Sequence, residues 1–361
     1  MPDTVQNRSG RLASLDILRG FDLFLLLFLQ PVLWAAGEAS DCGWLHRMLW
    51  YFDHEVWEGF RPWDLVMPLF LFMTGAAMPF SFSKYLSGRK SRRPLYRRIV
   101  RRVLVLFLFG MIVQGNLLAF DPDHIYIYTN TLQAIAVGYL IAALLMLNFR
   151  AGGQLAATLL LLVIYSLPML IRGDYTPEGN FAFDVDRIVI GRFRGDLTYT
   201  WVWSSLTFGV TVMAGAFAGM MMRGASDHKK TAALMACAGI LLVVAGLALS
   251  SVEPIVKRIW TSTMTLYSSG WCFLLMAFFY WWIDCLGHYR GLNWLKIYGM
   301  NPITAYVLGE VIDFRSIVTS VSYGLEPVLG AYYSVWLAFG NFLILFLILR
   351  FMYRRGIFLK V

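Results

Sequence analysis

One histidine lies among carboxylic acids immediately before a long apolar segment. His54 is flanked by Asp53, Glu55 and Glu58, and Asp64 lies where the apolar segment begins. An imidazole in such a setting can act as a general base or as a nucleophile, and a neighbouring carboxylate can orient it and tune its charge. Chemistry at His54 is one interpretation. The other is a histidine at a lipid–water interface that takes no part in a reaction.

Charged side chains also occur inside an apolar segment near the N-terminus. Asp16 and Arg19 are three residues apart and would share one face of a helix, where they can pair. An ionisable group inside a membrane span costs about 2.5–3.5 kcal/mol on insertion scales, so its presence needs a reason. Either the two form a structural ion pair near the cytoplasmic surface, or Arg19 faces an anionic ligand on the cytoplasmic side.

Polar residues mark three further apolar segments. Gln133 starts one, Trp260 precedes another, and Asn301 is followed by Pro302 inside a third that also holds Glu310. Proline removes a backbone hydrogen bond, so we expect a discontinuous helix at Asn301, a device that transporters use at binding sites. Hydrogen bonding between helices is the alternative role for the amides, and interfacial anchoring is the alternative for the segment around Trp260.

The segment 84–102 is strongly basic. Most of its charge is expected to orient the chain and to attract lipid headgroups. A second use is to bind the phosphates of a cosubstrate, because guanidinium groups contact phosphate in bidentate fashion. Arg98 and Arg102 are our candidates for that use. The sequence contains no glycine-rich nucleotide loop, nucleophile elbow or HExxH motif, so nucleotide hydrolysis, hydride transfer and zinc proteolysis have no support.

The composition predicts a protein that lies mostly in lipid. Of the 361 residues 58% are hydrophobic and 15% are charged, and the mean hydropathy is +0.61. Soluble domains carry about 25% charge. The apolar runs are long and do not alternate with polar residues, which favours helices over a barrel.

The net charge of +9 is no sign of nucleic-acid binding, because the basic residues lie in short loops. The four cysteines show neither disulfide nor metal spacing, and we expect no metal.

The elements that must position these residues are about ten transmembrane helices. Basic residues concentrate in alternate loops, which places both termini in the cytoplasm and His54 on the opposite side. We expect a single domain over 1–361, with a cytoplasmic tail at 1–13 and a long extracytoplasmic loop at 172–200. The predicted spans are 15–36, 63–83, 98–119, 130–148, 153–171, 201–223, 230–250, 263–284, 295–313 and 331–353.

Taken together, the motifs resemble the heparan-α-glucosaminide N-acetyltransferase family and its bacterial relatives. They occur in the order of the family and extend over nearly the whole chain. The motifs are Ser14-Leu15-Asp16 with Arg19-Gly20, His54-x-x-Trp57-x-Gly59 followed by Asp64-Leu65-Val66-x-Pro68, Leu132-Gln133 with Tyr139, Asp186-Arg187 with Gly191, Trp260-Thr261, and Gly299-Met300-Asn301 with Tyr306 and Glu310.

The resemblance implies an enzyme that takes acetyl-CoA from the cytoplasm and transfers the acetyl group to an amino sugar on the far side. The matching histidine is His54, which the family uses as its catalytic residue. Gln30 stands where the family often has asparagine, and we assign it with Asp64 to the catalytic group. The expected cofactor-binding residues are Arg19, Arg98, Arg102, Gln133, Trp260, Tyr298 and Asn301. The expected substrate-binding residues are Asp53, Glu55, Trp57, Glu58, Asp186 and Glu310.

The sequence departs from the family mainly on the acceptor side, where Gly309 replaces a histidine beside Glu310. Two alternatives to the amino-sugar enzyme therefore stay open. One is an O-acyltransferase that acts on a cell-envelope glycan or lipid, and the other is a sugar transporter or flippase without chemistry. We further expect a multi-pass protein of the cell membrane, with a bacterial inner membrane as its place, and a homodimer. Its partners would be a small acceptor and membrane lipids, with no nucleic acid.

Overall fold

A computed structural model describes residues 12–86, 91–115, 125–195 and 198–359. Within these ranges the regular structure is helical, apart from one isolated antiparallel bridge between Glu58 and Val256. Most of the predicted tail 1–13 lies outside the described residues. The described chain groups into two compact units.

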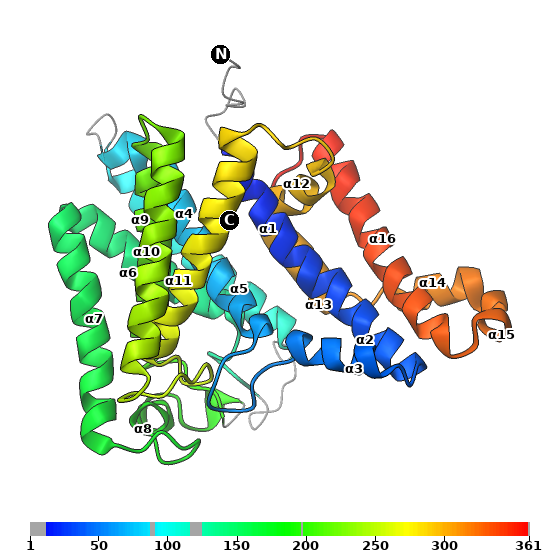
Figure 1. Ribbon diagram of the computed structural model, residues 1–361, viewed down its shortest axis with the longest axis horizontal. Helices are drawn as coiled ribbons and strands as arrows, with labels where there is room; N and C mark the ends of the chain where they lie inside the picture. The colour runs from blue at the N-terminus through cyan, green and yellow to red at the C-terminus, as the bar shows by residue number, and fades with distance from the viewer. Residues whose placement is uncertain (1–11, 87–90, 116–124, 196–197, 360–361) are drawn as a thin grey trace. The chain divides into compact units, whose positions relative to one another are not determined.

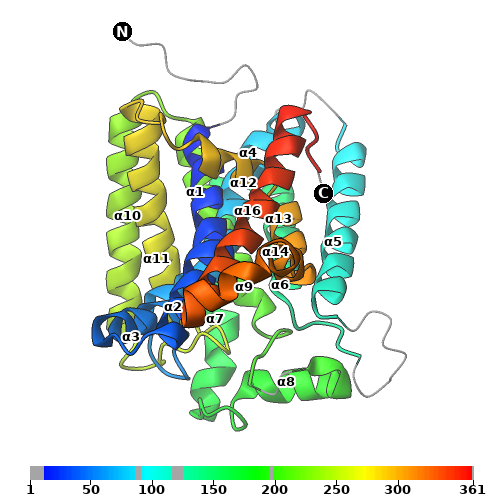
Figure 2. The same ribbon diagram turned by 90° about the vertical axis from the view of Figure 1, so that its right-hand side faces the viewer.

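The first unit combines Met1–His54, Arg61–Val66 and Gly287–Lys360. In it α1 packs along α12, and α16 packs against α2 and α12, as Figures 1 and 2 show. Its helices are α1 (Ala13–Phe24), a π-helical segment (Leu25–Leu29), α2 (Gln30–Ala39), α3 (Gly43–Leu49), a 3₁₀-helix (Pro62–Leu65), α12 (Asn293–Met300), α13 (Pro302–Val311), α14 (Arg315–Ser322), α15 (Glu326–Leu329) and α16 (Tyr333–Arg354).

The second unit combines Glu55–Phe60 with Met67–Leu286. Here α10 lies along α11, and α6 packs between α5 and α9, while α8 adjoins the end of α7 (Figure 1). Its helices are α4 (Val66–Leu86), α5 (Arg93–Val113), α6 (Thr131–Asn148), α7 (Ala151–Arg172), α8 (Phe181–Val189), α9 (Ser205–Arg223), α10 (His228–Leu249), α11 (Ser262–Phe279) and a π-helical segment (Tyr280–Cys285).

Eight stretches within the described residues are long and apolar enough to cross a membrane. Each corresponds to one predicted span, and the chain is therefore an all-helical, multi-pass membrane protein. The stretches are Ala13–Ala39, Pro62–Leu86, Thr131–Asn148, Ala151–Arg172, Ser205–Arg223, His228–Leu249, Ser262–Cys285 and Arg315–Arg354. The total of ten spans and the cytoplasmic place of both termini stay predictions.

Two of the ten predicted spans have no counterpart among these eight stretches. The range 98–119 falls partly on α5, a helix that begins with a cluster of arginines at Arg93, and its end lies outside the described residues. The range 295–313 is divided into α12 and α13 at Asn301, whose backbone is not helical. The discontinuous helix expected from Asn301-Pro302 is confirmed, and neither half has the length of about 20 residues that a span needs.

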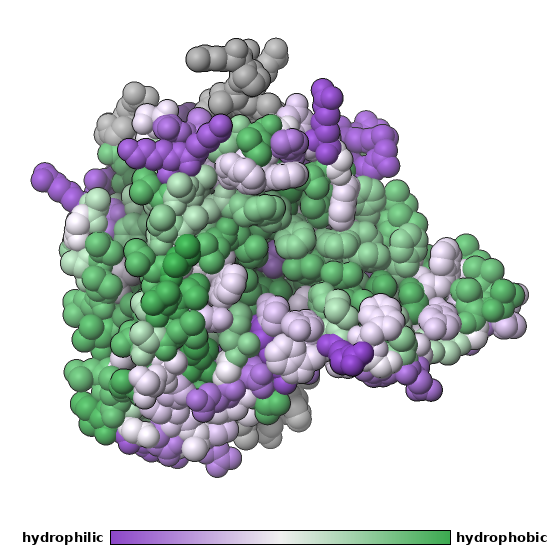
Figure 3. All heavy atoms as spheres, viewed as in Figure 1, coloured by the Kyte–Doolittle hydropathy of each residue, from purple (hydrophilic) through white to green (hydrophobic). Residues whose placement is uncertain are grey.

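Lipid-facing surface is evident on the two most apolar helices of the second unit. Leu155, Leu159 and Leu167 of α7 are exposed, as are Leu241 and Val244 of α10. Figure 3 shows hydrophobic residues over the middle of this region and hydrophilic residues gathered at its ends. Large apolar surfaces of this kind do not face water in soluble proteins, so they indicate contact with hydrocarbon.

Glycines let α4 and α9 approach closely. A Cβ added to Gly75 would lie 1.8 Å from the carbonyl oxygen of Val212, and a Cβ added to Gly215 would lie 1.8 Å from that of Phe72. Small residues permit such backbone contact between membrane helices. Gly219, four residues after Gly215, likewise faces Ala76 of α4. This small-residue face therefore packs within the chain, and the homodimer expected from the sequence stays a prediction.

The expectation of one domain over 1–361 also stays a prediction, because packing within each unit does not decide whether the two fold separately.

The loop 172–200 contains α8 and the 3₁₀-helix Gly191–Arg194. Asn180 starts α8 by accepting a hydrogen bond from the N–H of Phe183. The described part of this loop therefore carries helical structure of its own.

Candidate functional site

The imidazole of His54 is paired with a buried carboxylate. Its Nδ1 lies 2.8 Å from Oδ1 of Asp64. The Asp64 side chain is fully buried, whereas 42% of the His54 side chain is accessible. One edge of the imidazole is thus fixed inside the protein while part of the ring remains open to a reactant.

A short 3₁₀-helix places Asp64 for this contact. Pro62 starts the turn with a backbone that is already suited to a helix, and Asp64 occupies its third position. The second carboxylate oxygen, Oδ2, accepts a hydrogen bond of 2.9 Å from the N–H of Arg61, in the manner of a capping box. Both oxygens of Asp64 are therefore engaged, and the carboxylate cannot rotate without breaking a bond.

The chain that leads into His54 is held by several contacts of the first unit. The Gln30 side-chain amide donates to the carbonyl oxygen of Phe52 at 2.9 Å. The Phe52 ring packs on the buried Trp63, with centroids 5.6 Å apart. The Arg61 guanidinium lies 5.0 Å from the ring centroid of Trp50. Gln30 thus contacts the backbone two residues before His54.

The other acidic residues near His54 have different contacts. Asp53 accepts the backbone N–H of His54 at 2.7 Å and also pairs with Arg61. Glu55 accepts the N–H of Val56, and Glu58 forms the backbone bridge to Val256. The sequence named four carboxylates around His54, and the one at the imidazole is that of Asp64.

The arrangement fixes the chemistry that His54 can perform. An ionised carboxylate only accepts hydrogen bonds, so Nδ1 of His54 carries its hydrogen toward Asp64. The Nε2 atom then holds the lone pair and is the basic, nucleophilic end of the ring. The negative charge of Asp64 also stabilises an imidazolium that forms when Nε2 takes up a proton. This geometry suits general-base or nucleophilic catalysis.

Comparison with known proteins decides the family. Residues 11–246 match the family model described as heparan-α-glucosaminide N-acetyltransferase, catalytic. The chain belongs to this family. The matched range includes His54, Asp64, Arg98, Arg102 and Gln133, so most of the predicted site lies within the family's catalytic region.

Two curated relatives carry the same name. The mouse protein, heparan-α-glucosaminide N-acetyltransferase of Mus musculus, is 29% identical over 147 residues, which are 40% of this chain and 20% of the relative. The human protein, from Homo sapiens, is 30% identical over 142 residues, which are 38% of this chain and 19% of the relative. The aligned part thus spans about a fifth of each of these relatives.

The two arginines expected to bind phosphate lie on one face of α5. The guanidinium of Arg98 lies 5.9 Å from the ring of Tyr85 in α4, and that of Arg102 lies 4.4 Å from the ring of Tyr139 in α6. Arg98 is exposed and Arg102 is half-buried. A spacing of four residues puts both cations on the same face of α5, with Arg98 in its second turn and Arg102 near its middle.

Gln133 and Trp260, also expected on the donor side, are buried in local contacts. Gln133 completes the capping box that starts α6, and its amide nitrogen donates to the carbonyl oxygen of Ile127. The Trp260 indole N–H donates to the Thr211 hydroxyl, and its ring meets that of Phe208 edge-on. Trp260 has a φ of 51°, a strained value for a non-glycine residue. Their predicted roles stay predictions.

The remaining donor-side candidates lie in the first unit. Asn301 bonds the carbonyl oxygen of Ile357 and the N–H of Leu359 through its side-chain amide, which ties the C-terminal segment to the break between α12 and α13. Tyr298 is buried and stacks on Phe342. Arg19 forms the expected pair with Asp16 at 3.8 Å. These contacts are structural, and they leave the ligand roles of the three residues untested.

Among the residues expected to bind the acceptor, Asp186 anchors the long loop. Its buried carboxylate accepts the N–H groups of Trp201 and Val202 at 2.6 and 3.0 Å. Burial raises the pKa of Asp186 to about 6, although these N–H groups oppose the rise. Glu310 is exposed near the end of α13, and the Trp57 indole N–H donates to the carbonyl oxygen of Tyr175. Binding of an acceptor by these three residues stays a prediction.

One buried acid was missed in the sequence. Glu253 follows α10 and is 5% exposed, and its Oε2 accepts a hydrogen bond from the Ser166 hydroxyl. The only signal in the sequence was a glutamate between two apolar stretches, next to Pro254. Such a residue is indistinguishable from a solvated loop glutamate until the chain is folded.

Proposed function

We propose that this protein transfers the acetyl group of acetyl-CoA to the amino group of a glucosamine-like sugar. The observation that carries the proposal is the His54–Asp64 pair, which lies within the part of the chain that matches the family's catalytic region. The paired, accessible imidazole supplies the group that acyl transfer to an amine needs. The names of the mouse and human relatives support the glucosaminide as acceptor.

In the reaction, the free amine attacks the thioester carbonyl, the C–N bond forms and the C–S bond breaks. His54 Nε2 accepts the proton that the amine must lose, and the departing CoA thiolate is protonated in turn. In the alternative route the acetyl group is carried on His54 before it reaches the amine. Asp64 stabilises the positively charged imidazole in either route.

The donor is proposed to enter from the basic cytoplasmic face. Arg98 and Arg102 would bind its phosphates, since both are cations on one face of α5. CoA is highly charged and stays in water, whereas its pantetheine arm tolerates the apolar space between helices. His54 would then lie near the opposite face of a bacterial inner membrane, in keeping with the charge pattern of the loops.

The test is an acetyl-transfer assay with purified protein, labelled acetyl-CoA and glucosamine. We expect N-acetylglucosamine from the wild type and a rate at least about 100-fold lower from His54→Ala. The matched control is His46→Ala, since His46 is an exposed histidine of the same extramembrane loop. Equal rates for wild type and His54→Ala would contradict the proposal. Acetylation of hydroxyl acceptors in place of glucosamine would favour an O-acyltransferase.

A further inference from the structure

Two short helices of the first unit, α14 and α15, precede the last apolar helix, α16. A 3₁₀ turn at Tyr323–Leu325 joins α14 to α15, and a second at Gly330–Tyr332 leads into α16. The helical stretch from α14 to the end of α16 has 40 residues, which would measure about 60 Å as one straight helix, about twice the thickness of the hydrocarbon core. Gly330, with a φ of 53°, turns the chain between them. The 22 residues of α16 are enough for one crossing, so α14 is a separate element.

One face of α14 is fixed to the first turns of α16. The Trp336 indole N–H donates to the Ser322 hydroxyl oxygen at 2.9 Å. A Cβ added to Gly340 would lie 2.6 Å from the side chain of Val318, which is buried. Val318 and Ser322 are four residues apart and share a helix face. Figures 1 and 2 show α14 lying against α16, so its direction is set by the span that it contacts.

The exposed flanks of α14 differ in polarity. Ile317 and Val321 are four residues apart, and 51% and 84% of their surfaces are exposed. Ser316 and Ser320, one position earlier in each case, are also exposed, and their hydroxyls donate to backbone carbonyl oxygens of the preceding turn. The helix thus presents an apolar flank beside a polar one, the pattern of an amphipathic helix.

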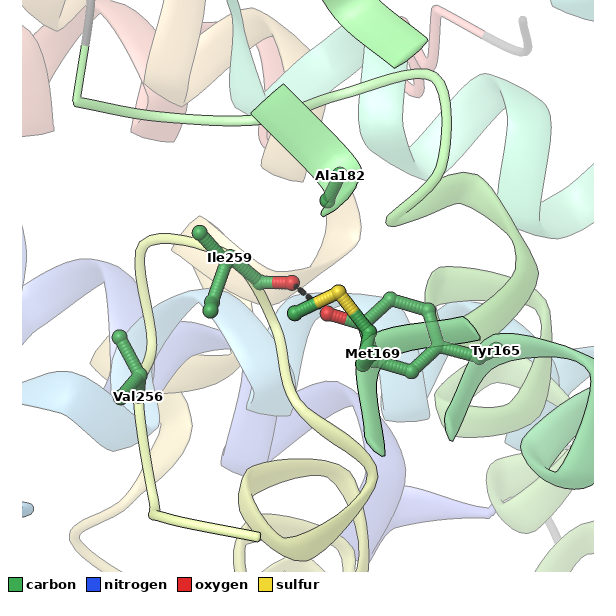
Figure 4. Close-up of a cluster of buried hydrophobic side chains, with 5 residues drawn as sticks. All are labelled: Tyr165, Met169, Ala182, Val256 and Ile259. Carbon is green, nitrogen blue, oxygen red and sulfur yellow. Dashed lines mark hydrogen bonds between the residues drawn. The ribbon is translucent and has the colours of Figure 1, made fainter. Parts of the chain in front are cut away.

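The start of α8 shows how the chain covers an apolar helix face elsewhere. Ala182 lies in a core with Tyr165 and Met169 of α7 and with Val256 and Ile259, where the Tyr165 hydroxyl donates to the carbonyl oxygen of Ile259 (Figure 4). All five side chains are buried. The described part of the chain provides no such cover for the apolar flank of α14, so that flank faces a solvent.

The apolar surface of α16 identifies that solvent. Trp336, which bonds to α14, begins a stripe of exposed apolar side chains that continues with Phe339, Leu343 and Leu347. These residues recur at helical spacing on one face of a span, where they contact hydrocarbon. Figure 3 shows hydrophobic residues on α16 and on the segment of α14 and α15. The surface that faces lipid therefore extends to α14.

The composition around α14 also suits a lipid–water boundary. Tyr323 and Tyr332 are exposed, and tyrosine places an apolar ring in lipid with its hydroxyl in the headgroup layer. The charged residues between positions 312 and 332 are Asp313, Arg315 and Glu326. So few charges, with a net charge of −1, give no attraction to anionic headgroups. Contact with acyl chains is the interaction that this segment offers.

Contacts within the first unit place this segment at the same end as His54. The Ser334 hydroxyl, in the first turn of α16, donates to the carbonyl oxygen of Ala35 in α2 at 3.4 Å. Gln30 of the same helix donates to the carbonyl oxygen of Phe52, two residues before His54. The start of α16, with α14 on it, thus shares one end of the unit with the imidazole.

We propose that α14 lies in the plane of the membrane surface at the His54 end of the first unit. Ile317 and Val321 insert among the acyl chains of that leaflet, and Ser316 and Ser320 face water. The partner is the hydrocarbon of a phospholipid leaflet, whatever the charge of its headgroups. The predicted spans leave residues 314–330 as a plain connector, whereas this role makes the segment a lipid anchor of the unit that holds His54.

The test is the environment of a nitroxide spin label in phosphatidylcholine vesicles. Labels are attached to Ile317→Cys or Val321→Cys in the full chain with its native cysteines replaced, and Ser316→Cys and Ser320→Cys are the matched controls. Collision with oxygen, which concentrates in hydrocarbon, is compared with collision with a water-soluble nickel chelate. We expect the first two labels about 5–10 Å below the headgroup level and the two controls in water.

Three results would overturn the inference. Labels at Ile317→Cys and Val321→Cys that meet nickel as readily as the serine controls would place the apolar flank in water. Protection from both reagents would mean that protein covers the flank, and spin–spin broadening that dilution with unlabelled protein removes would identify a second copy. Insertion only in vesicles of anionic lipid would show attraction to headgroups instead of apolar contact. Acetyl transfer enters none of these measurements, so they stand apart from the proposed function.

Discussion

At the scale of single residues, the proposed reactivity of His54 depends on how Asp64 holds its ring. The carboxylate is fully buried. Its two oxygens accept hydrogen bonds, one from the imidazole Nδ1 and the other from the backbone N–H of Arg61. Such a carboxylate fixes the tautomer of the ring as well as its direction. Removing only the charge, with the shape preserved, should therefore impair the reaction and leave the fold in place.

We predict that Asp64→Asn lowers kcat for acetyl transfer about 100-fold. Its amide can turn an N–H toward Nδ1, which shifts the imidazole hydrogen to Nε2 and removes the reactive lone pair. Asp53→Asn is the control, because the hydrogen bond that Asp53 makes is with the backbone N–H of His54. Steady-state rates for the two variants check this, and a kcat for Asp64→Asn within about threefold of that of Asp53→Asn would contradict it.

The sequence predicted His54 and Asp64 but could not say which carboxylate pairs with the ring. Asp53, Glu55 and Glu58 are closer in the chain, and the choice depends on the 3₁₀-helix that returns Asp64 to His54. The contact of Ser166 with Glu253 was not predictable, because these residues are 87 positions apart and meet only through packing of the helices.

At the scale of elements, apolar run length and polar interruptions predicted most helices and the break at Asn301. Exact ends were less predictable, because they depend on local caps such as Thr261, whose hydroxyl accepts the N–H of Met264 at the start of α11. The place of α8 was also not predictable. It is set by the contacts of Asp186 with the chain before α9, at Trp201 and Val202.

We predict that Asp186 makes stability depend on pH. Its pKa of about 6 in the folded protein exceeds the ordinary value of 3.8, so between these values the folded state binds more protons than the unfolded state. Stability from this group is therefore present below about pH 4 and is lost as the pH rises through 6, by about 3 kcal/mol in all.

Thermal unfolding of wild type and Asp186→Asn in detergent, followed from pH 4 to pH 7, measures this effect. The asparagine does not titrate, so the melting temperature of the wild type should fall relative to that of the variant as the pH rises. A difference between the two that stays constant over this range would show that the carboxyl group does not titrate as described.

We predict that Gly75→Ala destabilises the second unit by about 2 kcal/mol, because the new methyl group would overlap the carbonyl oxygen of Val212 and force α4 from α9. Gly152→Ala is the control. Among the described residues, no heavy atom outside its own helix turn lies within 4 Å of a Cβ added at Gly152. Melting temperatures in detergent test the pair, and equal values would contradict close packing of the two helices.

At the scale of the whole molecule, the basic loops predict which ends of the helices face the cytoplasm. The basic residues predicted the sidedness of the loops, but a helix bundle has the same internal contacts in either orientation. Single cysteines resolve this in a protein whose four native cysteines are replaced. We predict that Glu178→Cys reacts with an impermeant maleimide on intact cells, and that Arg97→Cys reacts only after permeabilisation. Labelling of Arg97→Cys on intact cells would reverse the orientation.

The central claim is that His54 catalyses transfer of an acetyl group from a donor on one side of the membrane to an amine on the other. The most direct measurement uses sealed proteoliposomes with labelled acetyl-CoA on the side of Arg97 and glucosamine on the side of Glu178. We predict labelled N-acetylglucosamine on the glucosamine side with the wild type, and none above background with His54→Ala. Product formation by His54→Ala at the wild-type rate, or only when both substrates share one side, would contradict the account.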